Sequence, residues 1–384
     1  MVDLLIAMLI FGVVSGAILD LLPPATAAFD TQLEVSDLQQ RLRVAISTLQ
    51  RDLAAAGAGA HGGGSLGVLG DYLAPVLPYR WGASNPDPPG TFRTDTITVL
   101  FVPDAAAETA VVKRMPPLGA EQVIETRGDC GGVRHDARCG FAPGMRVLLY
   151  RPRARWDVGV ATQVHDAALH LVSAPALPPE YDAADAVAAQ LEAHSYYLKT
   201  DVANDRFELM HYDGDQTDLP VVDHVVKLAF RYWGDPRPPQ LIAGRALSDP
   251  GPWTTYGPPP PDIGSPSGMA WPDGENCVFT TAAGAHVPRL ADLVPGAGGL
   301  AQLTAALLND GPWCPDAITA FRYDADLLRV RRIDITLRVE AGPAWLRGPA
   351  SVFFTRAGTA QTSRYVPDQE ITFTVAPRNL GTER

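Results

Sequence analysis

Basic residues are scarce at the start of this chain: no lysine or arginine precedes Arg41. A cleaved signal peptide begins with a basic segment, so this absence argues against one. The whole chain has 31 Lys and Arg against 43 Asp and Glu, a net charge of −12. That balance argues against general affinity for nucleic acid or anionic lipid. No alternating βαβ pattern is present, so a doubly wound α/β fold is not expected.

Cysteine is also rare, with four residues in 384: Cys130, Cys139, Cys277 and Cys314. In an exported chain an even set indicates disulfides. Three pairings exist. We favour 130–139, whose members are close in sequence and flank a glycine-rich turn, together with 277–314. Four reduced buried thiols are the alternative.

What the chain does have is an apolar start. No charged residue lies between Leu4 and Leu19, and a helix over residues 4–22 would be roughly 28 Å long, close to the hydrocarbon thickness of a bilayer. Residues 29–56 continue as an amphipathic helix that Gly57 would end. Its apolar face consists of Leu38, Leu42, Ile46, Leu49 and Leu53. We therefore predict one long helix, with a kink at Pro23-Pro24.

After residue 57 the pattern changes to short β-rich runs separated by turn signals. We predict strands at 96–101, 145–150, 160–164, 169–172, 195–200, 207–212, 221–233, 328–339, 351–355 and 370–375. Residues 234–276 form an irregular Pro/Gly-rich insertion, and a short helix is expected at 299–309.

The predicted fold class is α+β: a long N-terminal helix followed by a large antiparallel β-rich head. We divide the chain into the helix (1–57), the β-rich head (58–233), the insertion with its short helix (234–320) and C-terminal strands that complete the head (321–384).

The opening residues Val2-Asp3-Leu4-Leu5-Ile6-Ala7-Met8, with Gly12 four residues later, resemble the mature N-terminus of type IV pilins and type II secretion pseudopilins. That segment reads Phe-Thr-Leu-Val-Glu-Leu-Leu-Ile-Ala-Met in the family, so Asp3 falls on its glutamate. The basic leader, the glycine before the cleavage point and the first two mature residues are absent. We therefore expect the translated start to lie upstream of Met1.

Later motifs are similar to PilW-type minor pilins. They are Arg51-Asp52-Leu53 leading to Gly57, the Tyr-Tyr-Leu strand at 196–198, the strand at 225–232, and Arg378-Asn379 near the end. This resemblance implies an assembly protein rather than an enzyme, with no small-molecule substrate. It implies a minor pilin that helps to initiate or cap a type IV pilus at its tip, with an adhesive role.

The resemblance also implies the partners and location. The helix would contact other minor and major pilins and the inner-membrane assembly platform. The chain would sit in the inner membrane with a periplasmic head, then in an extracellular pilus. Asp3 would pair with the N-terminal amine of a neighbouring subunit, and Leu4, Leu5, Ile6 and Gly12 would be assembly residues. An interfacial Asp at the positive end of its own helix is the alternative for Asp3.

Two other functions stay open. A GspJ-like pseudopilin of a type II secretion system belongs to the same physical class. A membrane-anchored secreted enzyme or carbohydrate-binding module is the alternative of another class, and it would need polar residues clustered around an apolar pocket.

Several motifs match catalytic or metal signatures only formally. Residues 57–62 satisfy G-x-G-x-x-G, but they follow a helix rather than a strand. Residues 63–67 satisfy G-x-S-x-G inside a glycine-rich linker, not at a strand-to-helix turn. Cys130, His135 and Cys139 fit no zinc spacing. We expect no cofactor.

Calcium is the one ion that stays open, because Asp213, Asp215 and Asp218 lie in one acidic turn. The order of these residues is not that of an EF-hand, and Asp-Gly is an ordinary hairpin turn.

Overall fold

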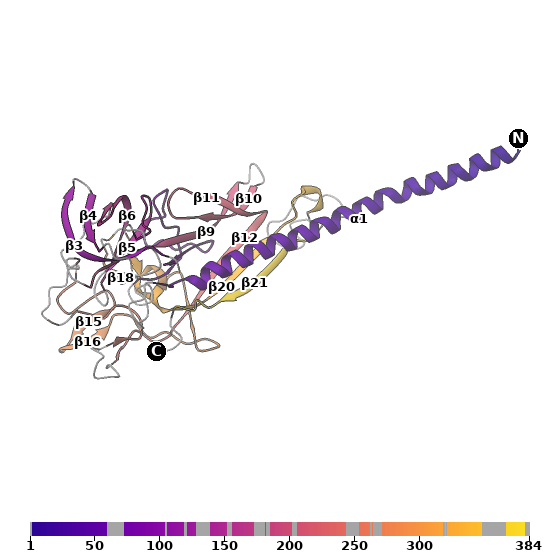
Figure 1. Cartoon of the computed structure of the whole chain (residues 1–384). Helices are drawn as coiled ribbons and strands as arrows, with labels where there is room; N and C mark the ends of the chain where they lie inside the picture. Colours follow the sequence, from indigo (N-terminus) through magenta and orange to yellow (C-terminus); the bar gives the residue numbers. More distant parts are fainter. Residues whose placement is uncertain are drawn as a thin grey trace.

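Helix α1 dominates the shape of the molecule. The structure, a computed structural model, describes residues 2–59, 73–103, 106–118, 121–127, 139–151, 156–172, 181, 185–201, 206–242, 253–261, 263, 271–317, 319, 321–347 and 366–380. Helix α1 (Val2–Ala55) is 54 residues long and continues through Pro23-Pro24. Gly57 ends it with a φ of +74° and donates its N–H to the carbonyl of Leu100 (3.0 Å). Figure 1 shows the N-terminal half projecting from the head as a rod.

A five-stranded antiparallel sheet holds the C-terminal half of α1. Its order is β1-β2-β9-β10-β11, so β11 is an edge strand. Helix α1 contacts β2 and β11 of this sheet. The bounds are β1 (Val76–Leu77), β2 (Thr96–Phe101), β9 (Glu192–Asp201), β10 (Arg206–Tyr212) and β11 (Asp218–Asp223).

A closed six-stranded barrel is inserted between β2 and β9, which are themselves paired. Its order is β3-β4-β7-β6-β5-β8, and the β3–β8 pairing closes it. The barrel has a hydrophobic core of its own, which includes Ile124, Val147, Leu149 and Leu171. The bounds are β3 (Glu108–Leu118), β4 (Glu121–Thr126), β5 (Arg146–Tyr150), β6 (Trp156–His165), β7 (Ala168–Val172) and β8 (Val187–Gln190).

A second, four-stranded antiparallel sheet has the order β17-β12-β20-β21, and α1 contacts its strands β20 and β21. Both large sheets and α1 share the main core. Its strands are β12 (Val225–Gly234), β17 (Ala301–Leu303), β20 (Val330–Val339) and β21 (Gln369–Val375).

Smaller elements complete the head. The described residues include three two-stranded antiparallel sheets: β13 (Leu241–Ile242) with β14 (Trp253–Thr254), β15 (Phe279–Ala282) with β16 (Ala285–Pro288), and β18 (Trp313–Cys314) with β19 (Tyr323–Asp324). Short 3₁₀ turns are η2 (Leu307–Asn309), η3 (Ala325–Arg329) and η4 (Ala344–Leu346).

The predicted α+β class is wrong. Strands hold 41% of the residues and helices 21%, so the protein is mostly β. A helix followed by a β head is only partly matched, because the head is a barrel plus several sheets. The expected helix at 299–309 is replaced by strand β17 and the single turn η2. An eleven-residue segment is shorter than the roughly 12–15 residues that an isolated helix needs, and β17 pairs with β12 instead.

The strand predicted at 221–233 is two strands. His224 has a φ of +55° and separates β11 from β12, which belong to different sheets. The continuous apolar run therefore gave no sign that the chain passes from one sheet to another at His224. The string at 63–67, His135, Cys130 and the strand at 351–355 lie outside the described residues.

Candidate assembly helix and its junction with the head

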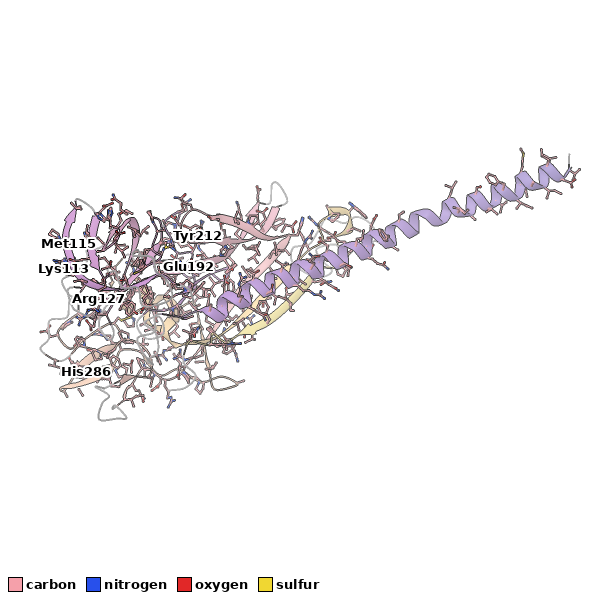
Figure 2. All side chains as sticks on the ribbon, in the orientation of Figure 1. Lys113, Met115, Arg127, Glu192, Tyr212 and His286 are labelled. Carbon is pink, nitrogen blue, oxygen red and sulfur yellow. A yellow bond between two sulfur atoms is a disulfide. The ribbon has the colours of Figure 1, made fainter. Side chains whose placement is uncertain are left out.

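The N-terminal half of α1 is exposed and apolar. Val2–Leu19 has a mean hydropathy of 2.5, and 0% of the segment is buried. Its 18 residues are about 27 Å long, which fits a membrane anchor or a signal sequence by length and composition. Figure 2 shows the side chains of this half projecting away from the helix on all sides.

The predicted assembly residues all lie on this exposed half. Leu4, Leu5 and Ile6 are 63%, 61% and 52% exposed. Asp3 lies in the first turn, where a negative charge stabilises the positive end of the helix. No described group of the head contacts these side chains, so they are free to pack against another molecule.

Two glycines in this half have no described residue packed against them from elsewhere in the chain. Apart from the adjoining helix backbone, a Cβ atom added at Gly12 or at Gly16 would meet no described atom within 4 Å. Glycine inside a helix costs about 1 kcal/mol relative to alanine. Small residues of this kind let helices approach closely where apolar helices pack together.

The C-terminal half of α1 is part of the head. Leu38, Ala45, Leu49 and Leu53 are fully buried in the main core. Their spacing of four and seven residues places them on one helix face. Of the predicted apolar face, Leu42 is also buried and Ile46 is partly buried.

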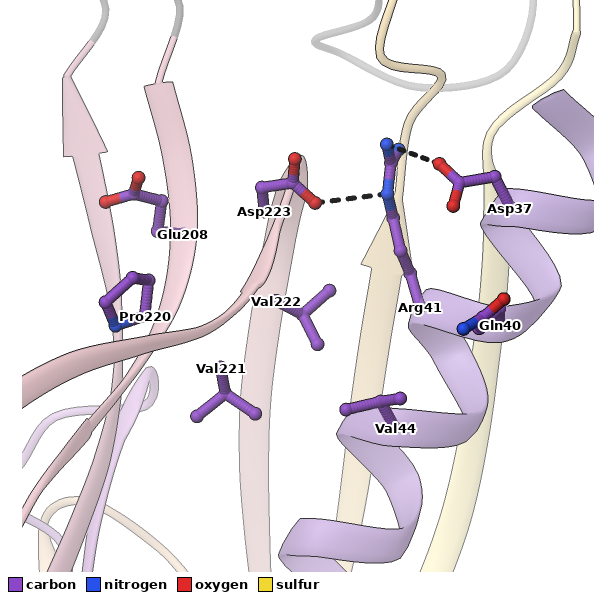
Figure 3. A pocket seen from close by; sticks show the side chains of 9 residues that line it. All are labelled: Asp37, Gln40, Arg41, Val44, Glu208, Pro220, Val221, Val222 and Asp223. Atoms are coloured by element: carbon purple, nitrogen blue, oxygen red, sulfur yellow. Dashed lines mark ion pairs between the residues drawn. The ribbon is translucent and has the colours of Figure 1, made fainter.

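Charged contacts fix α1 against β11 where the helix enters the head. Arg41 lies 2.5 Å from Asp37 and 3.1 Å from Asp223, as Figure 3 shows. Glu34 accepts the backbone N–H of Gly342 (2.7 Å). An open groove of about 470 Å³ runs between α1 and β11, lined by Asp37, Gln40, Arg41, Val44, Glu208, Pro220, Val221, Val222 and Asp223.

A buried polar cluster fixes the other end of the packed half. Asp52 Oδ2 accepts a hydrogen bond from the Tyr196 hydroxyl (2.6 Å) and lies 2.7 Å from His194 Nδ1. Arg51 Nε lies 3.1 Å from Asp52 Oδ1. Burial alone would raise the pKa of Asp52, but hydrogen bonds from His194 and Tyr196 outweigh it and lower the pKa to about 2. Asp52 is therefore ionised at neutral pH.

The three aspartates considered for calcium lie in or next to the turn between β10 and β11, and two of their carboxylates already accept hydrogen bonds. Asp213 Oδ1 accepts the backbone N–H groups of Asp215 (2.9 Å) and Thr217 (3.1 Å). Asp218 Oδ2 accepts the hydroxyl of Tyr197 (2.6 Å). These aspartates are not among the described groups whose ligand atoms converge.

The disulfide between Cys277 and Cys314 is confirmed. It joins the segment before β15 to strand β18. Cys139 is also disulfide-bonded, and its predicted partner Cys130 lies outside the described residues.

Within the part of the chain that the structure describes, two clusters of possible ligands were missed from the sequence: Asp52 with His194 and His211, and Asp310 with Asp324 and Asp326. Asp52 and His194 are 142 positions apart, so spacing gives no signal. A partial signal existed in the neighbouring predicted strands at 195–200 and 207–212. Pairing them as a hairpin places Tyr196 opposite His211, with His194 two residues away on the same face.

Comparison of the chain with protein families, curated proteins and solved structures gives no match.

Proposed function

We propose that this chain is a PilW-like minor pilin: a membrane-inserted filament subunit whose role is assembly rather than catalysis. The observation that carries the proposal is the division of α1. One continuous helix is exposed and apolar over Val2–Leu19 and is buried in the head core from Leu38 onward.

A simple membrane anchor does not need this design. About 20 residues span a bilayer, and a flexible linker can then carry the head. Here the same helix continues into the head and supplies part of its core. About 33 residues precede the first packed turn, a projection of roughly 50 Å. Such a rigid connection fixes the direction of the exposed half, which a subunit in a helical bundle requires.

The residues of the exposed half support packing against other helices. Gly12 and Gly16 weaken the isolated helix without improving the fold of the chain, so a close neighbouring helix would explain them. Asp3 is costly in hydrocarbon without a partner. The amine of a neighbouring subunit, as the pilin resemblance implies, would supply one.

The form of the head favours the tip of a filament. Figure 1 shows the barrel strands at the end of the molecule opposite the N-terminus, beyond the sheets that hold α1. A head of this bulk at every subunit would obstruct lateral packing, whereas one copy at the tip would not. The barrel would then face outward, where an adhesive surface would be useful.

The experiment is co-purification of the chain with the other pilins of its host from detergent-solubilised membranes. We expect Asp3→Ala to abolish recovery of the partners, with Asp30→Ala, which replaces an exposed acid on the same helix, as the matched control. Gly12→Leu should also abolish recovery while leaving the head's unfolding midpoint unchanged, because the space around Gly12 is open. Unchanged recovery with both Asp3→Ala and Gly12→Leu would refute the proposal, and recovery of secretion-system subunits instead would identify a pseudopilin.

A further inference from the structure

The junction between α1 and the five-stranded sheet gathers three groups that bind metals. Asp52 comes from α1, His194 from β9 and His211 from β10. One ligand atom from each lies within 4.8 Å of the other two. The two imidazole rings meet edge to face, with centroids 4.6 Å apart.

We propose that Asp52, His194 and His211 form a zinc-binding site that joins the assembly helix to the head. Two imidazoles and one carboxylate are ligands that Zn²⁺ prefers, and three protein ligands leave a fourth position for water. Calcium does not suit this set, because it requires six to eight oxygen ligands.

Binding would require a small local adjustment. His194 Nδ1 and Asp52 Oδ2 lie 2.7 Å apart. In a tetrahedral zinc site with bonds of about 2.0 Å, two ligand atoms lie roughly 3.3 Å apart, so these two atoms would separate by about 0.6 Å to bind one ion. Metal ligands bind in their deprotonated forms, so zinc would replace any proton shared between them.

The surroundings hold the ligands in place. Tyr196 donates its hydroxyl to Asp52 Oδ2 (2.6 Å), and Arg51 Nε lies 3.1 Å from Asp52 Oδ1. Glu192 Oε2 is 3.8 Å from His194 Nε2. The hydrogen bond from Tyr196 orients the Asp52 carboxylate, as groups around a metal site do. Both histidines are half-buried, so the ion can enter from solvent.

The other convergent cluster does not make a comparable site. It consists of three carboxylates without an imidazole, and Asp324 already accepts the backbone N–H groups of Gly311 (2.7 Å) and Asp326 (2.9 Å). Two histidines of the barrel supply a control for the experiment. His165 and His170 pack together, and His170 Nδ1 lies 3.2 Å from Glu121. The ligand atoms of those three do not form a convergent group.

The test is a zinc titration of the full chain in detergent, stripped with EDTA, purified without a histidine tag and competed against a chromophoric chelator. We expect one Zn²⁺ per chain with a dissociation constant below about 1 μM. His211→Phe keeps an aromatic ring against His194 and should weaken binding at least tenfold. His170→Phe is the matched control, because it removes a histidine of the barrel, and it should bind zinc like the wild type.

Thermal unfolding supplies a second measurement. Zinc should raise the unfolding temperature of the wild type and of His170→Phe, because it binds only the folded junction. It should not raise that of His211→Phe. The unfolding temperature in EDTA shows whether His211→Phe is folded; if it is not, His194→Gln replaces it with the same expectations. The proposal is wrong if the wild type does not bind zinc with a dissociation constant below about 1 μM, or if His211→Phe binds zinc as tightly as His170→Phe.

Discussion

Replacing Asp52 with asparagine removes a buried charge from the junction between α1 and β9. The Asp52 side chain is 5% exposed, and its pKa is lowered from 3.8 to about 2. A difference of about 1.8 pKa units corresponds to roughly 2 kcal/mol of stability at neutral pH. We expect Asp52→Asn to lose about that amount at pH 7.

The loss should depend on pH with a definite sign. The folded-state pKa of Asp52 lies below its unfolded value, so the ionised carboxylate stabilises the fold above pH 3.8. This contribution disappears as the pH falls through about 2. The difference in free energy between wild type and Asp52→Asn should therefore be constant from pH 7 to 5, shrink to about half at pH 3, and nearly vanish at pH 2.

Urea unfolding of the full chain in detergent with EDTA, followed by tryptophan fluorescence, measures the difference. Asp37→Asn is the matched control, because Asp37 also pairs with an arginine on α1 but its side chain is 47% exposed. An exposed pair of this kind contributes at most about 1 kcal/mol. A cost of Asp52→Asn that equals the control, or that does not change between pH 7 and 2.5, would refute the reasoning.

Two further predictions concern the head. Replacing Cys277 and Cys314 with serine opens a loop with a sequence separation of 37, which should cost about 4 kcal/mol by loop entropy; the shift in urea midpoint measures this, and reduction of the wild type should reproduce it. Burial raises the pKa of Asp324 to about 6, so its charged form destabilises the fold, and the head should gain stability as the pH falls from 7 to 4. Asp324→Asn should show a smaller gain between pH 7 and 4, and an equal gain would contradict this account.

The parts of the fold that were predictable are those set by local pattern. The length of α1 follows from an uncharged apolar stretch joined to a run of leucines with helical spacing. Strand β2 was predicted at its observed bounds, 96–101, and β10 within one residue. In each case the residues that define the element are neighbours in sequence, so their periodicity is enough.

The barrel could not be predicted in this way. Its closing strands carry weak signals, since β8 is Val-Ala-Ala-Gln and β3 contains a Pro-Pro pair. Alanine and proline are both poor strand formers. What holds these strands is the pairing of Glu108 with Ala189, which brings together residues far apart in the chain. Such a contact leaves no periodic pattern in the local sequence.

The residues of the candidate site also divide into those that a local sequence pattern shows and those that only tertiary contacts bring together. Asp3 and Gly12 are visible from the sequence because their context is a contiguous segment. Asp52 was visible only as part of a helix motif, and its importance comes from His194 and Tyr196, which the β9–β10 hairpin brings to it. Predicting that cluster requires the register of the hairpin and the way in which α1 packs on it, and both depend on tertiary contacts.

Two of the polar contacts along the packed half of α1 therefore matter beyond local stability. Arg41 with Asp223 fixes the helix where it enters the head, and Asp52 with Tyr196 fixes it near its end. Between them they set the angle of a rod that projects roughly 50 Å. A tilt of about 5° at the head would move Val2 by about 4 Å over that length. In the proposed filament, where side chains of neighbouring helices must meet within a few ångströms, losing either contact would misplace the far end of α1 without touching a residue there.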